Sequence, residues 1–411
     1  MAKYEDFVDK TYTPEKRELK CEFYIKPKKG VDLTWLCGGV AAESSIGTWT
    51  SLTTVKEYMT DLAATVYDIK KKGEGAEIKV SYPPELFEPG NMPNILSSVA
   101  GNIFGLKEIE NLRMTGFDLP EKLAKSFKGP KHGIKGVRKL TGKKTPLIGT
   151  IVKPKLGLKT KDHAKVAYDA WTGGCDIVKD DENLSSQNFN KFSERLKETV
   201  KMKEEAEQET GEKKIYMVNV TAETKDMLER AKEDKESGNE YLMVDIITCG
   251  WSALQTLRKN SQGLIMHAHR AGHAAFTKLD YHGISMPVIA TIARTIGVDQ
   301  LHVGTAVGKM SEDKEEVLAN IEACKKDYYG HKKVFPVASG GLNPLNIPDL
   351  LEIFGNDVII QAGGGIHGNP LGTKSGAAAM RQALEAALEN ESIEEKAKKN
   401  EELKAAVDKW G

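Results

Sequence analysis

From Leu147 onward, short apolar runs alternate with longer stretches in which apolar residues recur at helical spacing. A continuous apolar run is typical of a strand that helices cover on both faces, as in a parallel sheet. The runs are Leu147–Val152, Cys175–Val178, Ile215–Val220, Tyr241–Ile247, Leu264–His269, Gln300–Val303, Val334–Ala338 and Val358–Ala362. Helices are predicted between them, for example at Asp162–Trp171, Asn190–Gln208 and Thr224–Glu236. Eight consecutive strand–helix units predict a (β/α)₈ (TIM) barrel over residues 129–411, because an open doubly wound sheet rarely contains eight consecutive parallel strands.

The first 128 residues mix strand and helix patterns and predict an α+β domain of ferredoxin-like type, so the whole chain is assigned to the α/β class. Strands are predicted at Cys21–Ile25, Asp61–Ile69, Ala76–Tyr82 and Glu108–Phe117, with a β-rich stretch at Gly47–Leu52. Helices are predicted at 31–43 and Met92–Phe104. The basic, glycine-rich span Lys128–Lys144 predicts a linker, and the charged tail Glu391–Lys409 predicts an amphipathic helix with a solvated face.

Composition narrows the function classes. The length of 411 residues suggests about two or three domains. Lys+Arg and Asp+Glu are equal at 59 each, which argues against a nucleic-acid or acidic-membrane partner. Five scattered cysteines without metal spacing favour a reducing compartment. Because there is neither a signal-peptide core at the N-terminus nor an apolar run of membrane-spanning length, we predict a soluble cytoplasmic protein.

The stretch Gly173–Asn183 holds the most concentrated candidate chemistry. Its apolar residues stop abruptly in Lys179-Asp180-Asp181-Glu182. Strand alternation places Lys179 and Asp181 on one face, and Glu182 begins the loop. Two carboxylates at a strand end suit a hard cation such as magnesium, while the plainer interpretation is a solvated acidic turn.

Lys179 itself permits three interpretations. A free ammonium beside a divalent cation would repel it, so the lysine can instead be a Schiff-base nucleophile, as in barrel aldolases. It can form a plain salt bridge. It can also be a neutral amine that adds carbon dioxide and becomes a carbamate, which supplies an anionic oxygen ligand. Spacing alone does not choose among them.

Polar residues end the other predicted strands as well, and in a barrel these ends converge on the C-terminal face. They are Lys153 and Lys155, His267, His269 and Arg270, His302, Ser339 to Gly341, and Gly363 to Gly365. Glycine runs after strands seven and eight occupy the barrel's usual phosphate position, where backbone N–H groups can approach an anion. Arg270 and His302 are candidates for a second phosphate. His267 and His269, on one strand face, are an alternative zinc pair that lacks an obvious third soft ligand.

These motifs resemble the large chain of ribulose-1,5-bisphosphate carboxylase/oxygenase (RuBisCO) over nearly the whole sequence. The resemblance is carried by Gly149–Leu158, Gly174–Asn183, His267–Ala274, His302–Met310, Ala338–Gly341 and Gln361–Gly365, and in the N-terminal part by Ala42–Ser45, Gly47–Thr50 and Gly101–Gly105. It implies carboxylation of ribulose bisphosphate to two 3-phosphoglycerates, with competing oxygenation by O₂.

The resemblance also implies roles for individual residues. Lys179, carbamylated by CO₂, would hold Mg²⁺ with Asp181 and Glu182 and take the C3 proton of the substrate. Lys153 would be the acid/base at the carboxylated carbon, adjusted by Lys155, and Lys309 would hold the incoming CO₂. His269 would contact the sugar hydroxyls. The implied substrate-binding residues are Glu43, Thr48, Trp49, Asn102, Arg270, His302, Ser339, Gly341, Gly363 and Gly364, of which Glu43 and Asn102 would come from the partner subunit of a homodimer.

Two departures refine the resemblance. The chain lacks the long C-terminal tail of plant-type large chains, and Met310 follows the loop lysine where those chains carry leucine. Both features resemble the archaeal form III group, which assembles from large chains alone, without a small subunit, and whose implied role is disposal of ribose from AMP. The competing assignment is a RuBisCO-like enolase or isomerase of methionine salvage; such relatives typically lose residues like Lys309, which this chain keeps.

Overall fold

The computed structural model describes residues 3–50, 52–308 and 313–411. The chain divides into two units, Met1–Gly129 with Gly272–Ile296, and Pro130–Ala271 with Gly297–Gly411. We call them the N-terminal unit and the barrel unit.

The N-terminal unit is built on a mixed sheet with the strand order β10-β4-β1-β3-β2. Its strands are β1 (Leu19–Pro27), β2 (Thr65–Lys72), β3 (Gly75–Tyr82), β4 (Ile109–Asp118) and β10 (Gly283–Ile284). Its helices are α1 (Leu33–Glu43), α2 (Met92–Val99), α3 (Glu121–Lys125), α9 (Ala274–Thr277) and α10 (Met286–Ile296), with 3₁₀ turns η1 (Tyr4–Phe7), η2 (Glu57–Leu62), η3 (Pro84–Leu86) and η4 (Asn102–Gly105). Because β1 pairs antiparallel with β3 and β4, and β2 with β3, the βαββαβ order gives the ferredoxin-like arrangement expected from the sequence.

Three local predictions in this unit are wrong. The β-rich interpretation of Gly47–Leu52 fails because the described part of that segment is irregular and bends at Trp49 and Thr50. A Cβ on Gly47 would lie 2.6 Å from the Cβ of Ala42, so the chain folds tightly back on the end of α1. The strand predicted from Asp61 begins only at Thr65, because η2 precedes it.

The predicted helix Met92–Phe104 ends at Val99. A Cβ on Gly101 would lie 2.1 Å from the carbonyl oxygen of Ser97, so the backbone turns sharply there. The remaining residues form the separate 3₁₀ turn η4. The small and apolar residues continue from Met92 to Phe104, so nothing in the sequence indicated that the helix ends at Val99.

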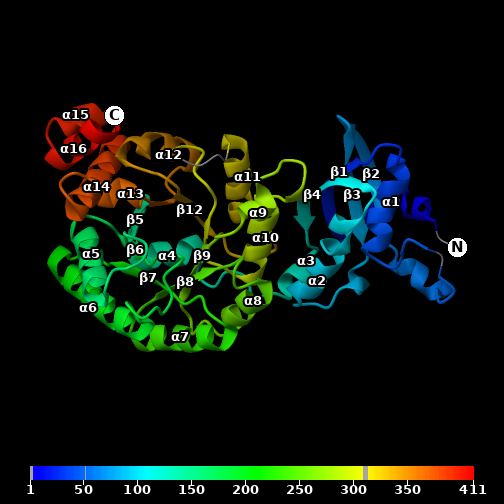
Figure 1. Ribbon diagram of the computed structural model, residues 1–411, viewed down its shortest axis with the longest axis horizontal. Coiled ribbons are helices and arrows are strands. Elements are labelled where there is room, and N and C mark those ends of the chain that lie inside the picture. The colour runs from blue at the N-terminus through cyan, green and yellow to red at the C-terminus, as the bar shows by residue number, and fades with distance from the viewer. Residues whose placement is uncertain (1–2, 51, 309–312) are drawn as a thin grey trace. The chain divides into compact units, whose positions relative to one another are not determined.

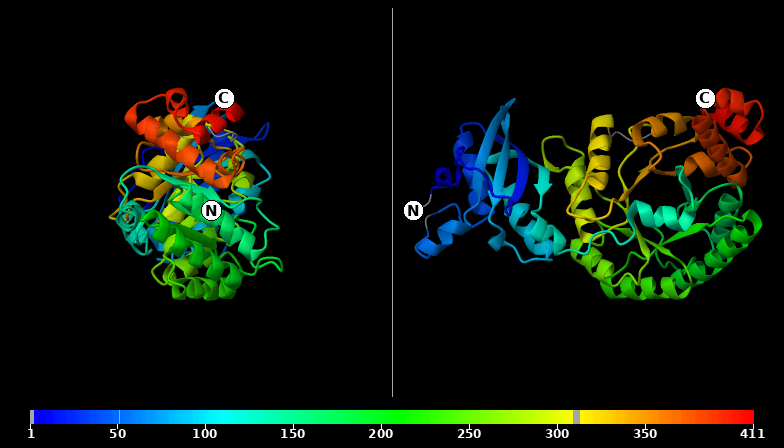
Figure 2. Two further views of the ribbon diagram at one scale, coloured as in Figure 1. Left: turned by 90° about the vertical axis from the view of Figure 1, so that its left-hand side faces the viewer. Right: turned by 180° about the vertical axis from the view of Figure 1, so that it is seen from behind.

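The barrel unit is a closed parallel barrel in the order β11-β12-β13-β5-β6-β7-β8-β9, which confirms the eight predicted strands. The strands are β5 (Leu147–Ile151), β6 (Ile177–Lys179), β7 (Ile215–Asn219), β8 (Tyr241–Asp245), β9 (Ile265–His269), β11 (Gln300–His302), β12 (Phe335–Ser339) and β13 (Ile359–Gln361). The helices are α4 (Gly133–Thr141), α5 (Thr160–Thr172), α6 (Phe192–Thr210), α7 (Thr224–Glu236), α8 (Trp251–Lys259), α11 (Lys314–Lys325), α12 (Ile347–Phe354), α13 (Gly364–His367), α14 (Thr373–Glu389), α15 (Ile393–Ala397) and α16 (Glu401–Trp410), with the 3₁₀ turn η5 (Pro344–Asn346). Helices α5 to α8 form an outer arc around the strands, green in Figure 1 and in the right-hand view of Figure 2.

The span predicted as a linker, Lys128–Lys144, instead contains α4, which belongs to the barrel core. Ile134 and Val137 of this helix are buried in one cluster with Leu147 and Phe335 of the barrel strands, and Leu140 packs against it. The three apolar residues follow helical spacing. The many lysines and glycines around them led to the linker prediction. The segment instead forms a helix that packs into the core at the amino ends of the strands.

The charged tail was predicted as one amphipathic helix and forms two. Helix α15 begins after Ser392, whose side chain accepts a hydrogen bond from the Glu395 N–H, and α16 begins after Asn400. Within the described parts of the chain, no helix is long and apolar enough to pass through a membrane.

Candidate active site

Most of the residues singled out in the second half of the sequence lie at the carboxyl ends of barrel strands. Lys179, His269, His302 and Ser339 are the last residues of their strands. Lys153 follows β5 by two positions, and the register of β5 and β6 pairs Ile151 with Lys179. This is the face on which barrel enzymes bind their substrates.

Lys179 is fully buried at the end of β6. Its Nζ donates to the carbonyl oxygen of Asp180 at 2.8 Å and lies 3.5 Å from Glu182 Oε2. Burial lowers the pKa of the Lys179 ammonium below its ordinary value, although Glu182 and Asp181 act in the opposite direction. The amine is therefore more easily deprotonated than an exposed lysine.

Asp181 is held by its neighbours from two sides. Lys153 Nζ donates to Oδ2 at 2.6 Å, while the backbone N–H and side-chain amide of Asn183 donate to Oδ1 at 3.1 and 3.0 Å. Burial alone would raise the pKa of Asp181, but these hydrogen bonds outweigh it and the pKa lies below its ordinary value. The carboxylate is thus ionised and oriented.

Asp180, the other acid of the cluster, points away from this site. It accepts from Arg195 Nε at 3.0 Å, from the Tyr216 hydroxyl at 2.7 Å and from the Asn219 N–H at 3.0 Å, and His163 Nε2 lies 3.1 Å away. Burial opposes ionisation, but the Arg195 guanidinium and the hydrogen bonds hold the pKa of Asp180 well below its usual range. Of the three adjacent acids, Asp180 is therefore a structural one.

Glu182 and His269 face each other across the site. Glu182 Oε2 lies 3.6 Å from His269 Nε2, and His269 Nδ1 lies 2.7 Å from Asp245 Oδ1. The Ala271 N–H also approaches Nδ1, at 3.2 Å, but the shorter contact to a charged carboxylate favours an Nδ1–H that donates to Asp245. Burial raises the pKa of Glu182, yet the positive charge of Lys179 and His269 outweighs it and the pKa is lowered.

His302 lies beside the ring of His269, with 4.7 Å between ring centroids. Its Nδ1 is 2.6 Å from Ser339 Oγ, and its Nε2 is 2.9 Å from His267 Nε2. His267 Nδ1 in turn is 2.9 Å from Gln300 Oε1. The two nitrogens of His267 are thus occupied by protein groups, which argues against the zinc pair considered from the sequence.

Small residues line the part of the face near β12 and β13. A Cβ on Gly363 would lie 3.1 Å from Lys153 Cε, so a larger residue there would press on the lysine. Gly341 has φ of 68°, a left-handed conformation that favours glycine. A Cβ on Gly364 would meet no atom within 4 Å, so its backbone borders open space.

The other site residues predicted in the barrel unit differ in their burial. Arg270 is buried directly after β9, whereas Lys155 is exposed on the loop after β5. Lys309 lies outside the described residues.

Glu43, Thr48, Trp49 and Asn102 lie in the N-terminal unit. Glu43 ends α1 and accepts a hydrogen bond from the Tyr4 hydroxyl at 2.6 Å, and Asn102 begins η4, where it is exposed. Trp49 is 82% exposed.

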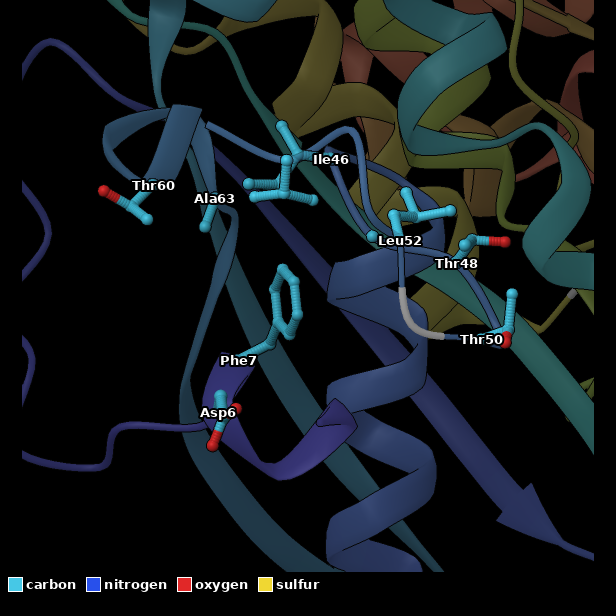
Figure 3. A pocket seen from close by; sticks show the side chains of 10 residues that line it. Asp6, Phe7, Ile46, Thr48, Thr50, Leu52, Thr60 and Ala63 are labelled. Carbon is cyan, nitrogen blue, oxygen red and sulfur yellow. The ribbon is translucent and has the colours of Figure 1, made fainter. Parts of the chain in front are cut away.

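Thr48 lines a hollow of about 500 Å³ in the same unit. Figure 3 shows the Phe7 ring facing this hollow, between the loop that carries Ile46 and the segment that carries Thr60 and Ala63. Its lining combines apolar side chains, such as those of Phe7, Ile46 and Leu52, with Asp6 and the hydroxyl groups of three threonines.

Among residues 3–50, 52–308 and 313–411, no three His, Cys, Asp or Glu side chains converge on one point as a ready-made metal site. The carboxylates of Asp181 and Glu182 are the hard oxygen donors of the strand-end face. Lys179 adjoins Glu182 and can join them only if it acquires an oxygen donor.

Sequence reasoning missed three residues that organise the site. Asp245 ends β8 and fixes His269, and Gln300 begins β11 and contacts His267. Asn219 ends β7, and its amide donates to the carbonyl oxygens of Glu182 and Leu184 at 3.2 and 3.0 Å. Each is a polar residue within or at the start of a predicted strand, and that signal was present in the sequence.

A (β/α)₈ barrel that gathers lysines, carboxylates and histidines at its carboxyl face has the architecture of the barrel enzymes. Residues 133–410 match the family described as ribulose bisphosphate carboxylase large chain, catalytic domain, and residues 6–123 match the N-terminal domain of the same large chain. The chain belongs to the RuBisCO large-chain family.

Its relatives include archaeal proteins that it matches over nearly their whole length. The protein named ribulose bisphosphate carboxylase from Methanosarcina barkeri is 49% identical, over 98% of this chain and 99% of that protein. The one from Pyrococcus furiosus is 48% identical, over 99% of this chain and 98% of that protein.

Solved structures agree in fold. An octameric RuBisCO from Pyrococcus horikoshii OT3, described as a complex with sulfate ion, matches with a TM-score of 0.96 and 45% identity, over 99% of this chain and 96% of that one. A dimeric archaeal RuBisCO from Hyperthermus butylicus matches with a TM-score of 0.93 and 42% identity, over 100% of both chains.

Proposed function

We propose that this chain is a ribulose-bisphosphate carboxylase, a carbon–carbon lyase. It adds CO₂ and water to D-ribulose 1,5-bisphosphate and releases two molecules of 3-phospho-D-glycerate, with O₂ as a competing substrate. The observation that carries the proposal is the position of Lys179, buried at the end of β6 with its Nζ 3.5 Å from Glu182. Family membership and the names of the archaeal relatives support the same reaction.

The donor set fits magnesium on one condition. Asp181 and Glu182 offer carboxylate oxygens, which Mg²⁺ prefers, whereas an ammonium on Lys179 would repel the ion. A carbamate formed from CO₂ and the Lys179 amine replaces that positive charge with an oxygen donor. When bound, the ion polarises the substrate's oxygens and stabilises negative charge on them.

The protein groups around this site can hold and move protons at defined atoms. Asp245 accepts from His269 Nδ1–H, which directs Nε2 toward Glu182 and the site, where it would accept a proton from a sugar hydroxyl. Lys153 Nζ donates to Asp181 at 2.6 Å and would deliver a proton to the carbon that gains the carboxylate. The Lys179 carbamate would take the C3 proton, and Lys155 would adjust Lys153.

Two groups of residues would bind the substrate's phosphates. Arg270 and His302 would hold one phosphate, with Ser339 positioning the sugar beside it. Backbone groups of Gly341, Gly363 and Gly364 would hold the other, together with Thr48 and Trp49 from an N-terminal unit. Arginine suits this task because its planar guanidinium matches phosphate geometry.

We further propose a homodimer with shared sites and no small subunit, in which Glu43 and Asn102 complete the partner's barrel. The dimeric and octameric states of the archaeal structures support self-association. Mixing Glu43→Gln subunits with Lys309→Ala subunits should then restore activity by forming some intact sites. Confirmed subunit exchange without restored activity would refute shared sites.

A cytoplasmic role of form III type, disposal of ribose from AMP, follows from the resemblance alone. Extracts of the source cells should form 3-phosphoglycerate from AMP, phosphate and CO₂, and removal of this chain should stop that conversion. Continued conversion in its absence would exclude the role.

Lys309 provides the experiment that separates a carboxylase from an enolase. Its ammonium would meet negative charge only as CO₂ becomes a carboxylate, after the C3 proton has left. Lys309→Ala should therefore lose carboxylation while still exchanging the C3 proton of ribulose bisphosphate with solvent. Equal loss of both rates, or retained carboxylation, would contradict this role.

A further inference from the structure

Five side chains form a continuous line of hydrogen bonds from the inside of the barrel to the proposed phosphate site. We call Tyr241, Gln300, His267, His302 and Ser339 the histidine line. The Tyr241 hydroxyl lies 3.3 Å from Gln300 Nε2 at the inner end. Gln300 Oε1 lies 2.9 Å from His267 Nδ1, and His267 Nε2 lies 2.9 Å from His302 Nε2. At the outer end, His302 Nδ1 lies 2.6 Å from Ser339 Oγ.

Both histidines of the line are uncharged. They are buried, and burial holds the pKa of each ring well below its ordinary value. Positive charge on Arg270 acts on His302 in the same direction. Each neutral ring carries one N–H, and the other nitrogen accepts.

Only one proton can occupy the contact between the two Nε2 atoms, so the line has two possible directions. In the first direction, His267 Nδ1–H donates to Gln300, His302 Nε2–H donates to His267, and His302 Nδ1 is an acceptor. In the second, the Gln300 amide N–H donates to His267, His267 Nε2–H donates to His302, and His302 Nδ1–H is a donor. The Tyr241 hydroxyl satisfies Gln300 in either case, because it both donates and accepts.

The two directions contain the same number of protons. Going from the first to the second moves one proton from His302 to His267 across the Nε2 contact, releases one from His267 Nδ1 and adds one at His302 Nδ1. The Gln300 amide turns over, so its nitrogen replaces its oxygen. No net charge appears in the barrel core.

We propose that Gln300 and His267 are positioning residues that allow an uncharged His302 to donate its Nδ1–H, whose partner in this structure is Ser339 Oγ at 2.6 Å, to the phosphate of the substrate in place of that serine. This inference rests on the proposed function, in which His302 contacts that phosphate. A phosphate dianion has no proton to give, so only the second direction suits it. In that direction the Gln300 side chain must donate an N–H to His267 Nδ1, which is the third hydrogen bond from the anion. An amide can donate in this way without carrying a charge.

A carboxylate at position 300 would prevent this, because it accepts hydrogen bonds and cannot donate them. Gln300→Glu should bind inorganic phosphate about 10- to 100-fold more weakly, as expected for the loss of a hydrogen bond to a charged group. Binding is measured by calorimetry on the full-length protein, with His302→Gln as the reference for complete loss of this contact. Phosphate affinity of Gln300→Glu within about threefold of the parent, with His267 carrying its proton on Nδ1, would overturn the proposal.

Gln361 offers a matched control. It is a second buried glutamine at a strand end, and its amide lies 3.8 Å from the sulfur of Met217 rather than beside a histidine. Gln361→Glu places the same charge in the barrel without touching the histidine line, so its phosphate affinity should stay within about threefold. A loss equal to that of Gln300→Glu would mean that buried charge, not hydrogen-bond direction, weakens binding.

A second measurement uses the parent protein and therefore does not depend on whether Gln300→Glu folds. In the phosphate-bound parent protein labelled with ¹⁵N-histidine, His302 should carry its proton on Nδ1 and His267 on Nε2, with signals assigned by their loss in His302→Gln and His267→Gln. A proton on Nε2 of His302 in that state overturns the proposal whatever Gln300→Glu shows. Neither readout requires turnover, so failure of the carboxylation assay would not be mistaken for failure of this inference.

Discussion

Lys153 Nζ lies 2.6 Å from Asp181 Oδ2 and joins the carboxyl ends of β5 and β6 by an ion pair. The lysine proposed as a proton donor is therefore bound to a carboxylate proposed as a metal ligand. Asp181 is almost fully buried, whereas the Lys153 side chain is 34% exposed and can reach toward a substrate. Proton delivery and metal binding are in this way connected through one hydrogen bond.

Replacing Lys153 should remove proton transfer and leave the fold intact. Lys153→Met should lower kcat by about 10²- to 10⁴-fold, the range for loss of a general acid/base. Asn183 still donates two hydrogen bonds to Asp181, so the far-ultraviolet circular dichroism should not change. Steady-state carboxylation would measure the effect, and a variant with more than a tenth of the parent rate would exclude Lys153 as the acid/base.

Asp180 and Asp181 are adjacent in sequence and should behave in opposite ways. Asp180→Asn leaves the buried Arg195 without its charged partner and should lower the free energy of unfolding by roughly 3–5 kcal/mol. Asp181→Asn should lower it by no more than about 1 kcal/mol, because Lys153 can turn to solvent, but should abolish activity. Urea unfolding of both variants measures this, and the reverse order of stabilities would refute the assignment of roles.

Activation should depend on CO₂ and magnesium through Lys179. Protein freed of both should be inactive until preincubated with them, and Lys179→Ala should stay inactive after any preincubation. Lys203→Met is a matched control, since Lys203 is another buried lysine, lies on helix α6 and pairs with Glu240 at 3.3 Å rather than with a site residue. Full activity in Lys179→Ala, or in the CO₂-free protein, would exclude the carbamate.

His367 should make stability depend on pH in the acidic range. Burial lowers its pKa to about 4, while its ordinary value in an unfolded chain is near 6.5. Between these values the unfolded chain binds the proton and the folded protein does not, so stability falls as the pH falls from about 6.5 to about 4.

The contribution of His367 is on the order of 1–3 kcal/mol over that interval. His367→Gln should remove it, because the amide can still donate to the carbonyl oxygen of Ile151 but does not titrate. Urea unfolding at pH 7 and pH 4.5 compares the two proteins. An equal loss of stability in both would show that His367 does not titrate as described.

The barrel was predictable because each strand is buried on both sides and reads as an apolar run. The strand ends followed directly, since parallel strands bring residues such as Lys179, His269 and His302 to one face. Helix α4 was not predictable from composition, because Ile134 and Val137 stand among lysines and glycines although they lie in the core.

The partners of the site residues were harder to predict than the residues themselves. Asp245 belongs beside His269 only because β8 and β9 pair in a register that aligns them. The opposite orientations of Asp180 and Asp181 follow from strand alternation, but the presence of Arg195 behind Asp180 depends on how α6 packs. Such contacts between distant parts of the chain leave no local pattern in the sequence.

The central claim is that this chain fixes CO₂ onto ribulose 1,5-bisphosphate. The direct test incubates the activated protein with ¹⁴C-bicarbonate, Mg²⁺ and ribulose 1,5-bisphosphate, and follows acid-stable label, with Lys179→Ala as the inactive control. With O₂ excluded, the account predicts one labelled carboxyl for each substrate consumed, recovered in 3-phosphoglycerate. Consumption or isomerisation of the substrate without incorporation of label would contradict it.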